Sequence, residues 1–294
     1  MRVVWVADKT DVQFASFRLR VWHLHKELQR RGIDSIIYRR GRFPQADVVI
    51  LQKAFSPRWL RLGQQLKAKG VQLIYSLSDV VPAGTRPFAV AVQLLALADA
   101  VIVCSRFLGE GFVQRYNPSW FVIEDPFDFL APAPRTMRQG THPTVFWHGF
   151  AKNQRLFVDP LRPLLRFQVH TLTETTQPRW SLDRLPSITE QHEIGFAPLP
   201  LYNLYVFGKS SNKVVGYMAA GLAIVASDAP AYRDVIVAGQ NGYLGCSAKD
   251  YNTAYELLRD PIHRQRIAQA GYETVKDRFS PSHLTERLLK VIDR

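Results

Sequence analysis

The chain has 294 residues, which at about 100 to 200 residues per domain favours two domains, and its 47% of hydrophobic residues excludes a disordered protein. No apolar stretch approaches the roughly 20 residues of a membrane span, and the first residues lack the apolar run of a secretory signal peptide. We therefore expect the mature chain to begin at Met1 and to be cytoplasmic. The two cysteines, Cys104 and Cys246, lack metal-ligand spacing, so we expect neither a disulfide framework nor a zinc site.

The formal net charge of +13 is concentrated in the first 70 residues, which hold 15 Lys and Arg against 5 Asp and Glu. Such an excess favours an anionic partner. An anionic lipid surface, an anionic acceptor and nucleic acid each fit, and a basic face that contacts only solvent is the alternative. Nucleic acid is the weakest of these partners because no nucleic-acid-binding motif is present. The basic residues in question are Arg30, Arg31, Arg39, Arg40, Arg42, Arg58, Arg61, Lys67 and Lys69.

Short β-branched runs alternate with longer amphipathic stretches in the first half of the chain, which predicts a parallel sheet flanked by helices. Strands are expected over 3–7, 35–38, 47–52, 71–76, 100–104 and 120–123. A first helix is expected from about Phe17 to Arg31, because apolar residues recur there at three- and four-residue spacings and Gly32 follows as a terminator.

The proline-rich stretch 125–143 predicts a linker. A second α/β series follows, with strands over 144–147, 167–171, 194–197, 222–226 and 243–244 and helices over 249–258, 262–278 and 281–292. The predicted organisation is an N-terminal domain (1–130), a linker (131–143), a C-terminal domain (144–278) and a last helix (279–294) that can pack back on the N-terminal domain. Open parallel sheets bind ligands outside the carboxyl ends of their strands, so we expect the site in a cleft between the two domains.

The most informative segment runs from Glu193 to Asp228: a strand, a loop ending in Gly208-Lys209-Ser210-Ser211, a helix and another strand. Unpaired backbone amides at the start of this helix, the hydroxyl groups and the cations of Lys209 and Lys213 suit a phosphate or diphosphate. The alternative is an ordinary serine N-cap with solvated lysines.

This segment resembles the donor-binding region of the family 4-like glycosyltransferases with the GT-B fold. The resemblance rests on GKSSNK, GYMAAG and AIVASD, and in the first half on FASFRLRVWHLHKELQRRG, DVVILQK, VQLIYSLSDV, ADAVIVCS and EDPFD. It implies two Rossmann-like domains that face each other across a cleft. It also implies transfer of a sugar, with retention, from a nucleoside-diphosphate sugar to a glycan or lipid-linked acceptor, by a scheme that needs no metal or cofactor. The basic residues of the first half suit such an acceptor and lead us to expect a peripheral protein at the cytoplasmic face of the membrane.

Two glutamates usual in the family are missing, because Gly208 and Gly216 occupy their positions. Each carboxylate would supply charge-assisted hydrogen bonds, worth about 1.5 to 3 kcal/mol, to the donor. The donor is therefore held differently, or another donor is used, or the protein is a non-catalytic nucleotide-sugar or polyanion-binding protein.

A second basic segment, HGFAKNQR, follows the first strand of the C-terminal domain. By resemblance, Lys152 and Arg155 face the donor diphosphate, where a cation stabilises the charge that grows on the leaving group. The alternative is that both cover the protein surface with their aliphatic stems. His148 and His170 could point into the cleft, although a lone histidine at a strand end is more often structural.

The acceptor side is expected in the loop from Asp8 to Ser16 and on the helix that follows. Arg18 matches an arginine of the family pattern, whereas Arg20 is expected on the solvated face. Asp79, at the end of a strand, is the first choice for proton handling and Asp8 the second; Asp79 could instead cap a following helix. Two further residues, Ser105 and Arg106, are expected to line the cleft.

Overall fold

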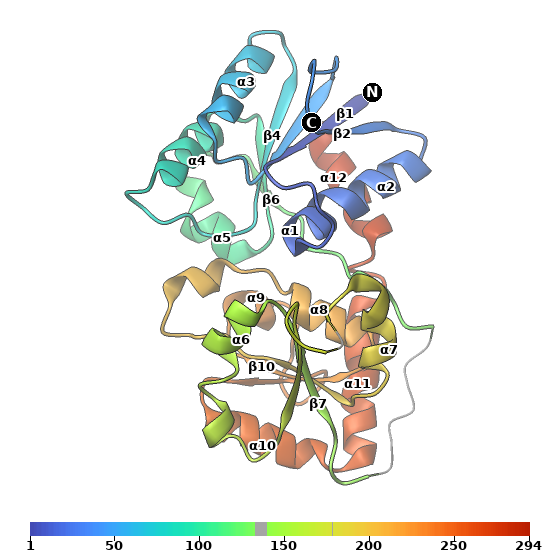
Figure 1. Cartoon of the computed structure of the whole chain (residues 1–294). Helices are drawn as coiled ribbons and strands as arrows, with labels where there is room; N and C mark the ends of the chain where they lie inside the picture. Colours follow the sequence, from blue (N-terminus) through green and yellow to red (C-terminus); the bar gives the residue numbers. More distant parts are fainter. Residues whose placement is uncertain (133–139, 178) are drawn as a thin grey trace. The chain divides into compact units, whose positions relative to one another are not determined.

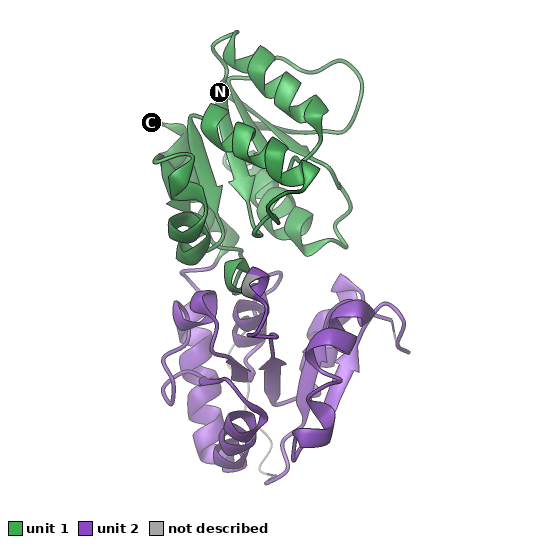
Figure 2. Cartoon of the chain, turned by 90° about the vertical axis from the view of Figure 1, so that its left-hand side faces the viewer, with its two compact units in different colours: residues 1–126, 207–210, 280–294 green, residues 127–206, 211–279 purple. Residues whose placement is uncertain are grey.

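The computed structural model describes residues 1–132, 140–177 and 179–294, so that most of the predicted linker, residues 133–139, lies outside the described part (Figure 1). The chain forms two compact units (Figure 2). Unit 1 comprises Met1–Pro126, Phe207–Ser210 and Ser280–Arg294, and unit 2 comprises Phe127–Val206 and Ser211–Phe279.

Unit 1 contains a six-stranded parallel sheet in the order β2-β1-β3-β4-β5-β6. Its strands are β1 (Arg2–Ala7), β2 (Asp34–Tyr38), β3 (Val48–Gln52), β4 (Gln72–Leu77), β5 (Ala100–Val103) and β6 (Trp120–Val122). All six strands predicted from the sequence are confirmed. Their apolar runs are continuous because helices cover both faces of the sheet and bury both sets of alternating side chains.

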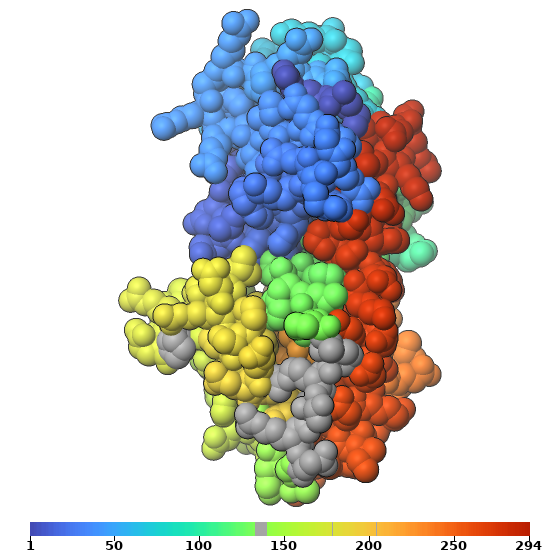
Figure 3. Space-filling view, turned by 90° about the vertical axis from the view of Figure 1, so that its right-hand side faces the viewer, coloured from blue at the N-terminus to red at the C-terminus, as the bar shows by residue number. Residues whose placement is uncertain are grey.

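The helices of unit 1 form two layers. They are α1 (Ala15–Phe17), the π-helical turn η1 (Arg18–Trp22), α2 (His23–Arg30), α3 (Pro57–Lys67), α4 (Arg86–Leu97), α5 (Arg106–Gly111), the 3₁₀ turn η2 (Val113–Arg115) and α12 (Pro281–Ile292). Apolar side chains of α2 and α12 share one core with one face of the sheet, and those of α3, α4 and α5 share another core with the opposite face. The C-terminal helix α12 lies directly against α2 (Figure 3).

Unit 2 contains a five-stranded parallel sheet in the order β11-β10-β9-β7-β8. Its strands are β7 (Val145–His148), β8 (Val169–Leu172), β9 (Ile194–Ala197), β10 (Ala223–Ser227) and β11 (Tyr243–Gly245), and they confirm the five predicted strands. The helical elements of the second half are α6 (Ala151–Phe157), η3 (Arg162–Leu164), η4 (Leu182–Arg184), α7 (Leu185–Thr189), η5 (Leu204–Gly208), α8 (Asn212–Ala219), α9 (Pro230–Arg233), α10 (Ala248–Leu258) and α11 (Pro261–Val275).

The two parallel sheets confirm the predicted α/β class. Because parallel strands point the same way, the loops after their carboxyl ends gather at one edge of each sheet, and this edge is where functional residues are expected. No helix within the described residues is long and apolar enough to span a bilayer.

Candidate functional site

Asp79 lies just beyond the carboxyl end of β4 in unit 1, between two lysines. Its Oδ2 pairs with Nζ of Lys53, and its Oδ1 lies 3.7 Å from Nζ of Lys209. The side chain of Asp79 is 37% exposed, so it can meet a ligand. It caps no helix, because the N-cap of the next helix, α4, is Thr85. The structure thus gathers a carboxylate and two cations at this edge.

Gly208 belongs to unit 1 and packs closely there. Its carbonyl oxygen accepts a hydrogen bond from Sγ of Cys104 at 3.5 Å. A Cβ atom at this position would lie 2.5 Å from Cγ2 of Val80. The position at which the family carries a glutamate is therefore closed to a side chain, since Val80 fills the space. Next to Gly208 and Lys209, the side chain of Ser210 is half-buried.

Asp8 lies at the same edge, after β1, and its carboxylate is engaged within the protein. It accepts hydrogen bonds from the indole Nε1 of Trp59 at 2.5 Å and from the backbone N–H of Phe55 at 3.2 Å, and it pairs with Arg58 at 3.6 Å. These contacts fix the loop after β1 to the start of α3. Asp8 and Asp79 are about equally exposed, at 34% and 37%, and both carboxylates have partners within unit 1.

The prediction that Arg20 lies on a solvated face is wrong. Arg20 is 2% exposed; its Nη1 donates to Oδ1 of Asp125 at 2.9 Å, and its Nε donates to Oγ of Ser76 at 3.2 Å. The prediction treated a charged side chain as solvent-facing, but the carboxylate of Asp125 balances the charge of Arg20 inside the protein.

The other residues predicted on the acceptor side have separate structural surroundings. Arg18 is buried, and its Nη1 donates to the carbonyl of Val12 at 2.7 Å, which holds the loop after β1. Ser16 is half-buried in α1. Ser105 is the buried N-cap of α5. Arg106 is exposed and pairs with a glutamate one turn along the same helix.

Sequence reasoning missed two neighbouring residues at this edge. Lys53 follows β3 with φ of 47°, a left-handed conformation that is uncommon outside glycine. Gln52, the last residue of β3, is 2% exposed, and neither polar atom of its amide has a partner among the described residues. The only sequence signal was a polar pair at the end of an apolar run.

In unit 2, the start of α8 lies near the carboxyl end of β7. Nζ of Lys213 donates to the carbonyl of His148 and lies 4.8 Å from the ring centroid of Trp147. Ser211 is the buried N-cap, but its hydroxyl makes no capping hydrogen bond to the first turn of α8. Lys213 therefore ties the helix to the strand, and the first-turn amides of α8 are not capped by Ser211.

Tyr217 makes a second hydrogen bond between α8 and β7. Its hydroxyl accepts a hydrogen bond from the backbone N–H of His148 at 3.0 Å. Burial raises the pKa of Tyr217 well above its ordinary value, so this hydroxyl stays neutral. On the same helix, a Cβ atom at Gly216 would meet no atom of residues 1–132, 140–177 or 179–294 within 4 Å. Position 216, where the family has its second glutamate, therefore has room for a side chain, whereas position 208 does not.

The predicted cations of α6, Lys152 and Arg155, are both exposed. The backbone N–H of Ala151, at the start of this helix, donates to the carboxylate of Glu174 at 2.9 Å. The cations of this helix are therefore the groups that remain available to an anion.

The two histidines of interest pack within unit 2. The ring of His148 stacks on Phe146 and Trp180, and His170 lies 3.1 Å from His192 between ring nitrogens. Both histidines thus have structural partners. Within the described ranges, no three His, Cys, Asp or Glu side chains are grouped as metal ligands.

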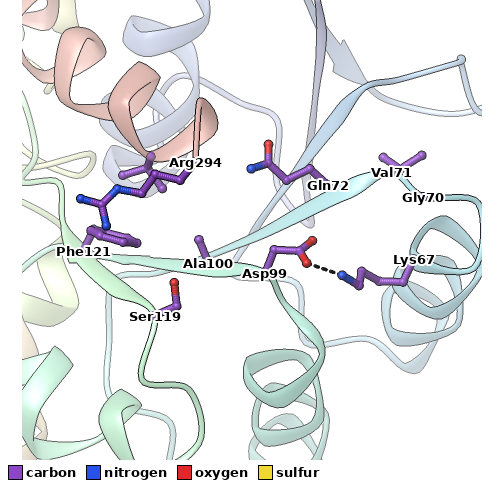
Figure 4. A pocket seen from close by; sticks show the side chains of 10 residues that line it. Lys67, Gly70, Val71, Gln72, Asp99, Ala100, Ser119, Phe121 and Arg294 are labelled. Atoms are coloured by element: carbon purple, nitrogen blue, oxygen red, sulfur yellow. Dashed lines mark hydrogen bonds and ion pairs between the residues drawn. The ribbon is translucent and has the colours of Figure 1, made fainter.

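A cavity of about 390 Å³ lies at the opposite, amino-terminal edge of the sheet of unit 1 (Figure 4). Asp99 pairs there with Lys67 and accepts from the backbone N–H of Leu73, while Arg294 lies over the ring of Phe121 at 4.6 Å. Its main charged groups are engaged within the protein, and parallel sheets bind ligands at the other edge. This cavity is therefore not the candidate site.

Comparison with known proteins agrees with this fold. Residues 151–290 match a family described as glycosyl transferase-like. A phosphatidyl-myo-inositol mannosyltransferase of Mycobacterium leprae is 36% identical over 83 residues, which cover 27% of this chain and 22% of that protein. The matched region thus spans about a fifth of the length of this curated relative.

Two solved structures are similar over the whole chain. HepE of Anabaena, solved with UDP-glucose, is similar with a TM-score of 0.73 at 14% identity. The alignment covers 100% of this chain and 99% of the HepE chain. Sucrose-phosphate synthase of Thermosynechococcus elongatus has a TM-score of 0.69 at 11% identity, and the alignment covers 100% of this chain and 98% of the synthase chain. The fold is that of the GT-B glycosyltransferases. This fold and the match over residues 151–290 agree with the resemblance drawn from the sequence.

Proposed function

We propose that the protein transfers a sugar, with retention, from a nucleoside-diphosphate sugar bound by unit 2 to a glycan or lipid-linked acceptor bound by unit 1. The observation that carries the proposal is the family match, because it covers the whole turn from Gly208 to Lys213 with its lysines and serines. The UDP-glucose complex of HepE supports the nucleotide donor, as that protein has the same fold.

The proposed chemistry rests on charge rather than on a bound cofactor. The exposed cations of Lys152 and Arg155 and the partly exposed Lys209 would stabilise the charge that grows on the leaving diphosphate. The first turn of α8, which Ser211 does not cap, would add backbone N–H donors. This scheme requires no metal. Turnover should therefore be unchanged by EDTA, and a loss of activity that Mg²⁺ restores would contradict this part of the proposal.

On the acceptor side, Asp79 is the proposed catalytic carboxylate. It is partly exposed and flanked by two lysines, an arrangement that suits a group orienting an acceptor hydroxyl. Asp8 is the second choice because its contacts with Trp59 and Phe55 fix the loop after β1, whereas the oxygens of Asp79 face lysine cations.

We further propose that the basic residues of unit 1 hold the enzyme at an anionic membrane surface. Several of the nine basic residues have partners within the unit, since Arg30 and Arg31 pair with Glu27, and Lys67 pairs with Asp99. The loop residues Arg39, Arg40 and Arg42 are exposed, and each cation near such a surface contributes about 1 kcal/mol. The test is sedimentation with phosphatidylserine vesicles at low salt. Wild-type protein should sediment, and the R39Q/R40Q/R42Q variant should stay in solution; equal sedimentation with neutral vesicles would contradict the proposal.

The central test combines ligand binding with turnover. A thermal-shift screen of nucleoside mono- and diphosphates and nucleotide sugars should show stabilisation by one nucleotide class, by about 2.7 kcal/mol at 100 times its dissociation constant. The selected sugar donor should then release its nucleoside diphosphate when a glycan acceptor is added, and NMR of the product should show a retained anomeric configuration. Binding without turnover would instead favour the non-catalytic nucleotide-sugar-binding protein, to which the glycines at 208 and 216 also point.

A further inference from the structure

A group of buried polar side chains lies at the carboxyl edge of the sheet of unit 1; we name Gln52, Ser78 and Arg20 the polar floor. Gln52 ends β3 and is in register with Ser76 of β4, whose hydroxyl accepts from Nε of Arg20 at 3.2 Å. Ser78 follows two residues later. The three residues are 2%, 7% and 2% exposed, so all are more than nine-tenths buried.

Each member of the polar floor has at least one polar atom without a partner in the described part of the chain. These atoms are both amide atoms of Gln52, Oγ of Ser78 and Nη2 of Arg20. Buried polar groups are nearly always hydrogen-bonded, so several unsatisfied groups at one strand edge call for a polar ligand. The edge is also the one at which parallel sheets bind ligands.

The chemistry of these atoms selects the ligand. The charge of Arg20 is balanced by Asp125 at 2.9 Å, with side chains 2% and 5% exposed, so the pair offers no net charge to an anion. The amide of Gln52 offers two N–H donors and one oxygen acceptor, and the hydroxyl of Ser78 can both donate and accept a hydrogen bond. A sugar hydroxyl also donates and accepts, whereas a phosphate dianion only accepts and would leave Oε1 of Gln52 unpaired.

The backbone around the polar floor is unusual in two places. Lys53, directly after Gln52, has φ of 47°, and Arg20 lies within the π-helical turn Arg18–Trp22. Both features cost free energy relative to regular backbone and are found preferentially at functional sites. Both features adjoin or include a member of the polar floor.

We propose that the polar floor binds hydroxyl groups of a neutral sugar in the acceptor, with Gln52 as the specificity-determining residue. The role of this sugar as acceptor rests on the proposed function, whereas the binding of a sugar does not. Because Gln52 is 2% exposed, binding requires the segment after β1, which starts beside Gln52 at Ala7, to release the contacts of Asp8 with Trp59 and Phe55.

The test is NMR of the full-length, ¹⁵N-labelled protein, in which the side-chain amide signal of Gln52 is assigned by its loss in Gln52→Met. Methyl glycosides of glucose, mannose, galactose and N-acetylglucosamine are titrated separately, and inorganic phosphate is titrated at matched ionic strength. We expect at least one glycoside to shift the Gln52 signal saturably and phosphate to leave it unchanged. The proposal is overturned if no glycoside moves the signal or if phosphate moves it.

Variants separate recognition from folding. Gln52→Met keeps the volume but removes the amide, and Gln64→Met on the exposed face of α3 is the matched control. With a transfer assay in hand, Gln52→Met should lower kcat/KM for the acceptor about tenfold or more while KM for the donor stays unchanged. Ser78→Ala should act in the same direction if Gln52→Met does not fold. A merely structural Gln52 would leave the acceptor kcat/KM at the wild-type value in a folded variant.

The outcomes also separate this proposal from the proposed function. If glycosides shift the Gln52 signal but no nucleotide stabilises the protein, the donor assignment fails and the polar floor stands. If a nucleotide sugar is turned over but no glycoside reaches Gln52, the glycosyltransferase activity stands and the polar floor fails.

Discussion

The guanidinium of Arg20 lies 2.9 Å from the carboxylate of Asp125, although 105 residues separate them in the chain. Both side chains are almost fully buried, and Arg20 also donates to the carbonyl of Ile123 at 2.9 Å. This pair fastens the π-helical turn to the segment that leaves β6. A buried ion pair with several hydrogen bonds is costly to break from one side only.

We therefore expect Arg20→Met to destabilise the protein by about 3 to 5 kcal/mol, because it leaves the charge of Asp125 buried and unpaired. Urea unfolding measures the change. The exposed Arg61→Ala on α3 is the control and should stay within about 0.5 kcal/mol of wild type. Removing both charges in Arg20→Met/Asp125→Leu should recover part of the loss; a double variant less stable than Arg20→Met would contradict the ion-pair explanation.

The strands could be predicted from the sequence because each is a short apolar run between turn residues. The run VVWVA became β1, and AIVAS became β10. Such runs reflect burial on both faces of a parallel sheet, which is a local property of the sequence. The fold class followed from the order of these runs.

The side-chain partners could not be predicted in the same way. Arg20 was misplaced because the carboxylate that balances its charge, Asp125, lies 105 residues further along the chain. The closeness of Gly208 to Val80 joins segments more than a hundred residues apart, and Asp79 pairs with a lysine 26 residues away. These relationships arise from the tertiary packing, which single-sequence patterns do not encode.

The two glycines at the missing-glutamate positions should respond oppositely to a methyl group. Gly208→Ala should destabilise the protein by about 1 to 3 kcal/mol, because its Cβ meets Cγ2 of Val80 at 2.5 Å. Gly216→Ala should stabilise it by about 0.5 to 1 kcal/mol, because the helix gains a better residue in open space. Chemical unfolding of both variants tests this, and Val80→Ala should relieve the Gly208→Ala defect. Equal effects at the two positions would rule out the steric account.

Lys209→Ala should reduce turnover at least about tenfold, since it removes a cation proposed to face the leaving diphosphate. Lys249→Ala, an exposed lysine in the first turn of α10, is the matched control and should keep wild-type turnover. Release of nucleoside diphosphate is measured at saturating donor. Near-normal turnover in Lys209→Ala would remove Lys209 from the proposed site without changing the fold assignment.

The ion pairs of Glu27 should make the stability of the fold sensitive to acid. Hydrogen bonds from Arg30 and Arg31 lower the pKa of Glu27 to about 2. A carboxyl with a lowered pKa stabilises the fold above its ordinary pKa, near 4.3, and this stability is lost as the pH falls toward about 2. Glu27→Gln should therefore cost about 1 to 2 kcal/mol at neutral pH, below the full linkage value because Arg30 is exposed. The Tm difference between Glu27→Gln and wild type should shrink between pH 5 and pH 2. A difference that grows on acidification would contradict the claim that ionised Glu27 stabilises the fold.

The two cysteines should differ sharply in reactivity. Burial, aided by the charge of Asp125, raises the pKa of Cys104 to about 12, so its thiol is both inaccessible and protonated. Cys246 is exposed, although partial burial and the nearby Asp228 raise the pKa of its thiol as well. Iodoacetamide should therefore alkylate Cys246 alone in the native protein, faster as the pH rises, and should reach Cys104 only after unfolding in urea. Mass spectrometry locates the label, Cys246→Ser should remove the native reaction, and rapid native labelling of Cys104 would show that the edge around Asp125 opens.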